Sequence, residues 1–259
     1  MSRRSTIHAC VHVRGAAMAA VLGLFACAAE GAFFPPTEAE WATWPDYCKA
    51  RHTSIEVYAV PKYKRRVSNE MRQQWRTLLG EQTWTNIHHG CQAIIHIARA
   101  ERMRGMHTTV AERQKFEWEL KQASQEATYS LNRTPPDHPV YHYMDSILAR
   151  VNYLRGNKAE AIARLREIVS KAPDQADMVA TLALYLYREK SYAEARDVLV
   201  NGLKNVETPS AEMHYFLGLT YVKLKDWDAA REQARKAYAL GYPLPGLKNK
   251  LRAAGQWTG

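Results

Sequence analysis

A pattern of small and apolar residues recurs three times in the C-terminal half of the chain, with offsets of 34 and 35 residues. A unit of this length is too short to enclose a core of its own, so successive copies have to stack and bury apolar surface between them. The repeat therefore constrains this half of the chain to an array of similar units. The recurring small residues are Ala149, Ala183 and Gly218 early in each copy and Ala161, Ala195 and Ala230 later, and the copies end at Pro173, Pro209 and Pro243.

Each copy is predicted to form two helices joined by a short turn. Gly156-Asn157 provides such a turn in the first copy, and the small residues let the two helices approach closely. Asn157 and Ser191 are each followed three residues later by a glutamate, a spacing that predicts a capping box at the start of the second helix. Three further residues are predicted helix caps because apolar runs follow them: Asp174, Ser210 and Asp226.

This pattern resembles the tetratricopeptide repeat over residues 142–243. The resemblance implies an all-α fold, a right-handed α-solenoid of helix hairpins in which the first helix of each repeat lines a concave groove. Asn152 stands where the family usually has an aromatic residue, and Asp145 and His214 occupy places that are often bulky and apolar. These departures concern the packing detail rather than the fold.

The segments on either side of the repeats are predicted to cover the ends of the solenoid. Residues 85–137 are expected to form a degenerate hairpin with helices over 85–104 and 109–131, and further helices are expected after Thr37 and over 68–79. Leu247 and Leu251 should face inward on a last amphipathic helix. The predicted divisions are 1–28 signal peptide, 29–84 N-terminal helical cap, 85–137 degenerate hairpin, 142–243 three repeats and 244–259 C-terminal capping helix.

The N-terminal segment has the pattern of a secretory signal peptide. Arginines precede an uncharged run over residues 16–29, which is too short to cross a bilayer as a helix. We therefore expect export to the periplasm. Two processing routes stay open, because Ala26-Cys27-Ala28 fits a cleavage site, whereas Leu24-Phe25-Ala26-Cys27 resembles a lipobox that would give an outer-membrane lipoprotein anchored through Cys27.

Two cysteines remain beyond this segment, Cys48 and Cys91. In an oxidising compartment they are expected to form one disulfide. The alternative is a structural or catalytic Cys2His2 metal site, because His52 follows Cys48 by four residues and His88 precedes Cys91 by three, spacings that place each pair on one helix face. Free thiols are the third hypothesis.

No motif in the chain predicts catalysis. It contains no glycine-rich nucleotide loop, no Gly-x-Ser-x-Gly and no His-Glu-x-x-His, so we expect no enzyme activity, no catalytic residue and no cofactor. Pro45-Asp46-Tyr47-Cys48 and His88-His89-Gly90-Cys91 resemble elements that exported proteobacterial tetratricopeptide repeat proteins place ahead of their repeats. That resemblance implies an exported helical scaffold and supplies no reaction.

Basic residues are in excess, with 36 Lys and Arg against 26 Asp and Glu. They concentrate between Lys49 and Arg76, where they would suit an anionic membrane surface, an acidic glycan or nucleic acid. An exported protein seldom meets nucleic acid, so we predict no nucleic-acid partner and keep a peripheral membrane contact as an option. The sequence makes no prediction of the oligomeric state.

The predicted function is a non-catalytic scaffold or adaptor of the cell envelope that binds a protein or peptide partner in the concave groove. Tyrosines alternate with cations there, which suits a peptide with aromatic or aliphatic anchors and acidic or C-terminal carboxylate groups. A lipid-anchored assembly factor and the metal site are the rival hypotheses. By repeat register the groove residues are Tyr143, Arg150, Tyr153, Thr181, Leu184, Tyr187, Arg188, Tyr215, Leu219 and Lys223.

Overall fold

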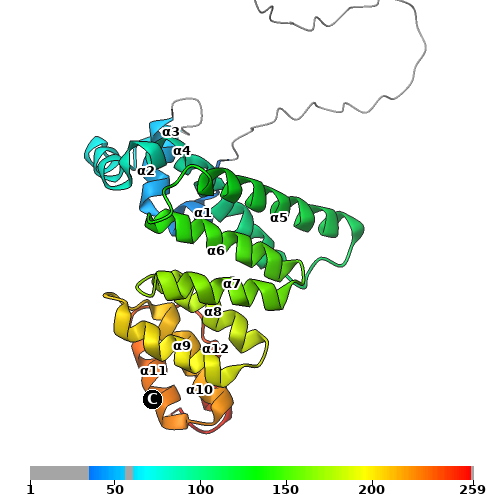
Figure 1. Cartoon of the computed structure of the whole chain (residues 1–259). Helices are drawn as coiled ribbons and strands as arrows, with labels where there is room; N and C mark the ends of the chain where they lie inside the picture. Colours follow the sequence, from blue (N-terminus) through cyan, green and yellow to red (C-terminus); the bar gives the residue numbers. More distant parts are fainter. Residues whose placement is uncertain (1–34, 56–60, 258–259) are drawn as a thin grey trace, which may run out of the picture. The chain divides into compact units, whose positions relative to one another are not determined.

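The computed structural model describes residues 35–55 and 61–257, and every regular element among them is an α-helix (Figure 1). The described residues belong to one compact unit, and the predicted signal peptide and Cys27 lie outside them. Among the residues described, no helix is both long and apolar enough to span a membrane. The helices are α1 Glu38–Thr43, α2 Asp46–Ser54, α3 Pro61–Lys64, α4 Asn69–Met103, α5 Val110–Leu131, α6 Pro139–Leu154, α7 Lys158–Lys171, α8 Ala176–Arg188, α9 Tyr192–Asn205, α10 Ala211–Leu224, α11 Trp227–Ala239 and α12 Gly246–Ala253.

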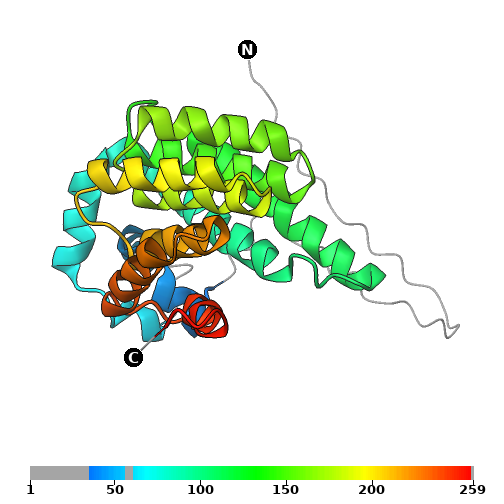
Figure 2. The same ribbon diagram turned by 90° about the horizontal axis from the view of Figure 1, so that it is seen from below.

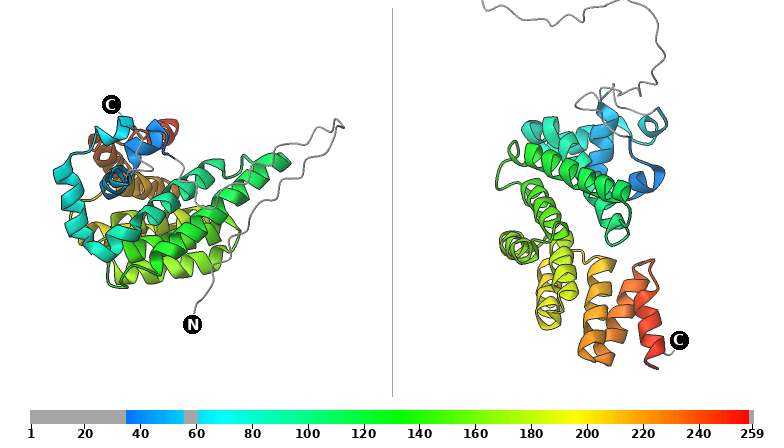
Figure 3. Two further views of the ribbon diagram at one scale, coloured as in Figure 1. Left: turned by 90° about the horizontal axis from the view of Figure 1, so that it is seen from above. Right: turned by 90° about the vertical axis from the view of Figure 1, so that its right-hand side faces the viewer.

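Three helix hairpins form the predicted repeats: α6 with α7, α8 with α9, and α10 with α11. Each hairpin packs against the next in chain order, as the green to orange helices show in Figure 2 and the right-hand view of Figure 3. A Cβ atom at Gly218 would lie 2.5 Å from Leu247 Cδ2, and one at Gly202 would lie 2.4 Å from Val179 Cγ1, so the helices approach too closely for side chains there. The all-α solenoid prediction is confirmed, and all six recurring small residues are buried.

Helix capping differs from the prediction at two of the repeat turns. Asn157 and Ser191 occupy the N-caps of α7 and α9, but their side chains make no cap hydrogen bond. Their ψ angles are 56° and 59° rather than the extended value of a side-chain cap, so the capping-box prediction is wrong there. Gln175 rather than Asp174 precedes α8. The predicted caps at Ser210 and Asp226 do accept backbone hydrogen bonds.

The N-terminal cap and the degenerate hairpin share one long helix. Two predicted helices, over 68–79 and 85–104, join in α4, with a break at Gly80, whose φ is +71°. A positive φ is easily adopted only by glycine, so this residue allows the change of direction. The predicted division after residue 84 therefore falls inside α4, whose C-terminal half packs against α5 and α6.

A compact aromatic and charged core fastens the cap to α4. The rings of Trp41 and Tyr63 stack with centroids 4.1 Å apart. Glu40, 8% exposed, accepts hydrogen bonds of 2.7 and 2.9 Å from the Arg99 guanidinium. Burial raises the pKa of Glu40, but the hydrogen bonds from Arg99 and from the Thr37 N–H outweigh it and bring the pKa to about 2. At the opposite end of the chain, Leu247 and Leu251 are fully buried, as predicted.

Candidate functional site

The first helices of the hairpins, α6, α8 and α10, carry the predicted groove residues, and the C-terminal end of α4 extends their row. Tyr153 of α6 stacks on Tyr185 of α8 with centroids 3.7 Å apart, and Glu101 of α4 reaches both α6 and α8. Side chains of four helices therefore meet on one surface. We call it the first-helix face and define it by Glu101, Arg104, Tyr143, Arg150, Asp177, Thr181, Leu184, Tyr187, Arg188, Glu212 and Lys223.

The centre of the first-helix face is occupied by an ion pair. Arg150 Nε donates to Glu101 Oε1 at 3.0 Å and Nη2 donates to Oε2 at 2.7 Å, with the two side chains 14% and 29% exposed. The Tyr185 hydroxyl donates to the same carboxylate at 3.4 Å. Burial raises the pKa of Glu101, but the charge and hydrogen bonds of Arg150, together with the Arg188 charge and the Tyr185 hydrogen bond, outweigh it, so the net shift is downward. Arg150 was predicted to offer its charge to a partner, and here that charge is neutralised within the protein.

Three predicted groove residues serve mainly in packing. Tyr153 is 4% exposed, and its hydroxyl donates to Glu189 Oε1 at 2.7 Å. Tyr215 is also buried, stacked on Tyr242 at 4.1 Å between centroids, and Leu219 lies in the same cluster. Of the other seven predicted residues, Lys223 is exposed and six are half-buried: Tyr143, Arg150, Thr181, Leu184, Tyr187 and Arg188.

Cations lie where α4, α8 and α10 end. The Arg188 guanidinium carbon sits 5.5 Å from the centre of the Tyr185 ring, and its Nη1 atom is buried with no hydrogen-bond partner among the described residues. Burial and the nearby Arg104 charge lower the pKa of Arg188. Lys223 Nζ lies 5.9 Å from the centre of the Tyr192 ring. This edge of the first-helix face is therefore positively charged and aromatic.

Carboxylates lie at the opposite edge, where α8 and α10 begin. Asp177 and Glu212 are both exposed and stand in the first turns of these helices. Burial raises the pKa of Glu212, and the Asp177 charge raises it further. Asp177 also raises the pKa of Tyr47 and Tyr143, in each case after the larger effect of burial.

The repeat register did not reveal Glu101, Asp177 or Glu212. Glu101 lies outside the recognisable repeats, and its partner Arg150 is 49 residues further along the chain. Asp177 and Glu212 precede the apolar part of their helices, where an acidic residue is ordinary. The sequence feature that could have identified Asp177 and Glu212 is that they occupy the same position in successive repeats.

The two cysteines are joined, as predicted. Cys48 of α2 and Cys91 of α4 form a disulfide with Cα atoms 5.5 Å apart, and both residues are buried. Trp44 Nε1 donates to the Cys91 carbonyl at 3.1 Å. The disulfide removes both thiolates from the alternative metal set of Cys48, His52, His88 and Cys91, and the free-thiol hypothesis is wrong as well. Among the described residues no group of three or more His, Cys, Asp or Glu side chains could hold a metal ion.

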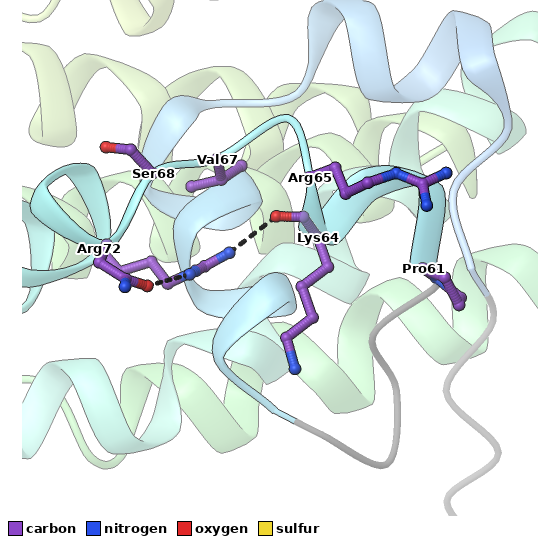
Figure 4. A pocket seen from close by; sticks show the side chains of 7 residues that line it. Pro61, Lys64, Arg65, Val67, Ser68 and Arg72 are labelled. Carbon is purple, nitrogen blue, oxygen red and sulfur yellow. Dashed lines mark hydrogen bonds between the residues drawn. The ribbon is translucent and has the colours of Figure 1, made fainter.

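The basic cluster of the N-terminal cap is partly neutralised, since four of its eight cations have carboxylate partners. Lys49 pairs with Asp46, Lys62 and Arg66 pair with Glu38, and Arg76 pairs with Glu81. A surface hollow of about 600 Å³ remains beside α3, lined by Pro61, Lys64, Arg65, Val67, Ser68, Asn69 and Arg72 (Figure 4). Arg72 is held by the Lys64 carbonyl and by Asn69, as the dashed lines show. A membrane contact at this cluster stays a prediction.

Comparison with known families agrees with the geometry of the hairpins. The family model described as tetratricopeptide repeat matches residues 148–200 and 180–243. These two ranges cover the end of α6 through α9 and then α8 through α11. A search of curated proteins gave no significant match. With three stacked hairpins, buried small residues at the repeat positions and a family match over residues 148–243, the chain is a tetratricopeptide repeat protein.

Proposed function

We propose that this protein is an exported, non-catalytic scaffold that binds a protein or peptide partner on its first-helix face. Tetratricopeptide repeats generally mediate protein–protein interaction, and proteins of this family are generally scaffolds without catalysis. The observation that carries the proposal is the composition of the first-helix face. Polar and aromatic side chains from four helices gather there, and several of them, such as Asp177, Arg188 and Glu212, are not used to hold neighbouring repeats together.

The packing of the hairpins supports this assignment. The main inter-repeat contacts are made by fully buried side chains, for example Met178, Leu182 and Met213. Tyr143, Leu184 and Tyr187 of the first-helix face pack against these clusters while staying only half-buried, so part of each side chain is available for recognition. Stacked hairpins that present one continuous surface suit an extended peptide or a helix of a partner.

Photo-crosslinking tests the location of the partner. A photoreactive residue at Thr181 or Tyr187 should capture one partner in cells, since both side chains are half-buried on the first-helix face. The matched control is Glu167, an exposed residue on α7, the outer helix of a hairpin. The captured protein, once purified, should bind the unmodified chain directly. Equal capture from Glu167, or no direct binding, would remove the proposal.

Export is part of the same proposal and has its own test. Intact-protein mass spectrometry on material from the native cell envelope should show a chain that begins near Ala29, or one with a diacylated Cys27 at its N-terminus. The mass should also rise after reduction and alkylation of Cys48 and Cys91, because these two form a disulfide. A mature chain that still begins at Met1 or Ser2 would contradict export.

A further inference from the structure

Two helices of the first-helix face repeat the same order of charges. Asp177 stands in the first turn of α8 and Arg188 is its last residue, while Glu212 and Lys223 occupy the matching places in α10. In each helix the acid precedes the cation by eleven residues. Eleven residues span about 16 Å of helix axis and return to nearly the same side of the helix. The first-helix face therefore has an acidic edge and a basic edge.

These four charges are not matched within the protein. Within the described residues no ion pair includes Asp177, Arg188, Glu212 or Lys223, whereas the central Arg150 is bound to Glu101 and the nearby Glu189 to Lys158. The Arg188 Nη1 atom is buried without a hydrogen-bond partner, which is costly unless something else accepts from it. The acidic edge and the basic edge can therefore each bind an oppositely charged group of a partner.

Helix dipoles explain part of this arrangement. They favour acids at helix starts and cations at helix ends, and the outer helices α7, α9 and α11 show the same order. In α9 and α11 the first-turn acids have partners, since Glu194 binds Arg166 and Asp228 binds Arg231, whereas no ion pair among the described residues includes Glu160 of α7. On the first-helix face the acids instead lie near tyrosine side chains, and Glu212 raises the pKa of Tyr242 after the larger effect of burial. Tyrosine rings beside carboxylates favour a cationic side chain.

We propose that the first-helix face binds an extended segment of the partner in which a Lys or Arg lies about five residues from an Asp or Glu. The cationic side chain meets the Asp177 and Glu212 edge, and the carboxylate meets the Arg188 and Lys223 edge. An extended chain rises about 3.3 Å per residue, so five residues match the distance of about 16 Å between the edges. This inference rests on the proposed function, and it adds a cationic residue to the partner expected from the sequence, a peptide with aromatic or aliphatic anchors and acidic or C-terminal carboxylate groups.

Synthetic peptides test this charge pattern without knowledge of the partner. Three fluorescent peptides of equal length are compared with the natively processed protein by fluorescence anisotropy: one with Lys and Glu five residues apart, one with Lys and Glu adjacent, and one with two Glu five residues apart. The first is expected to bind at least about tenfold more tightly than the other two. The preference should weaken as salt is added, because Asp177, Glu212 and Lys223 are exposed to water.

Charge reversal at one edge should change the preference rather than abolish binding. The double variant Asp177→Lys/Glu212→Lys has two basic edges, so it should lose about tenfold in affinity for the Lys/Glu peptide and gain affinity for the two-Glu peptide. Glu160→Lys is the matched control, because Glu160 is an exposed first-turn acid on the outer helix α7. Like the double variant, Glu160→Lys replaces an acid by a cation at the start of a helix. Its affinities for the three peptides should equal those of the wild type.

The outcomes separate this inference from the proposed function. Equal binding of the three peptides, no measurable binding of any, or the same shift in Glu160→Lys would overturn the charge pattern. If crosslinks from Thr181 and Tyr187 still identify a direct partner in that case, the scaffold function stands without it. Circular dichroism of the double variant shows whether it has folded, and Arg188→Glu/Lys223→Glu, which should instead favour a peptide with two Lys, gives an independent second test.

Discussion

Replacing Cys48 and Cys91 together by serine should lower the free energy of unfolding by about 4 kcal/mol. The disulfide closes a loop of 43 residues, which restricts the unfolded chain far more than a short loop would. That loop contains most of α2, all of α3 and about the first two thirds of α4. The core of this region includes a few aromatic side chains, such as Tyr63 of α3 stacked on Trp41 of α1. The variant should therefore lose stability mainly in the N-terminal cap.

Urea unfolding followed by circular dichroism measures this loss, and hydrogen exchange locates it. Amides of the cap helices should exchange faster in the variant, while those of α8 to α11 keep most of their protection. Wild-type protein unfolded in the presence of a reductant should match the variant, because both lack the same bond. A change of less than about 1 kcal/mol, or faster exchange spread evenly over the repeats, would show that the disulfide does not stabilise the cap in this way.

The repeat hairpins were predictable because their determinants are local and recurrent. Ala161, Ala195 and Ala230 are small for a reason that holds in every copy: each lies where two helices touch, and each is fully buried. The same logic placed Leu247 and Leu251 inward on α12. Side-chain capping was less predictable, since a favourable residue such as Ser191 makes a cap bond only if its ψ angle permits it.

The organisation of the first-helix face was only partly predictable. Repeat register identified Arg188 and Lys223 but not which cations are neutralised, because that depends on Glu101, which belongs to a helix without the repeat pattern. Tyr153 was expected to face a ligand and is instead covered by Tyr185 from the next repeat. Contacts between helices that are distant in sequence decide such cases, and no local pattern records them.

Replacing Glu101 by glutamine should lower the free energy of unfolding by about 2 to 3 kcal/mol near neutral pH, because Arg150 would keep its charge without a carboxylate in a mostly buried position. The sign of the pH dependence follows from the downward shift in the pKa of Glu101. Because the pKa of Glu101 is lower in the folded state, its ionised form stabilises the folded protein at a pH above the unfolded-state pKa of about 4.3. This stabilisation is lost as the pH falls through the folded-state pKa. The stabilities of wild type and variant should therefore converge in acid.

A surface ion pair on the neighbouring helices provides the matched control. Glu117 of α5 lies 3.8 Å from Arg155 at the end of α6, with side chains 60% and 37% exposed, so Glu117→Gln should cost less than about 1 kcal/mol. The double variant Glu101→Leu/Arg150→Met should be more stable than Glu101→Gln, since it leaves no uncompensated charge. If Glu101→Gln and Glu117→Gln have equal effects, or if the double variant is the least stable, the ion pair does not join the N-terminal hairpin to the repeats. The pair would then lie across that junction without holding it together.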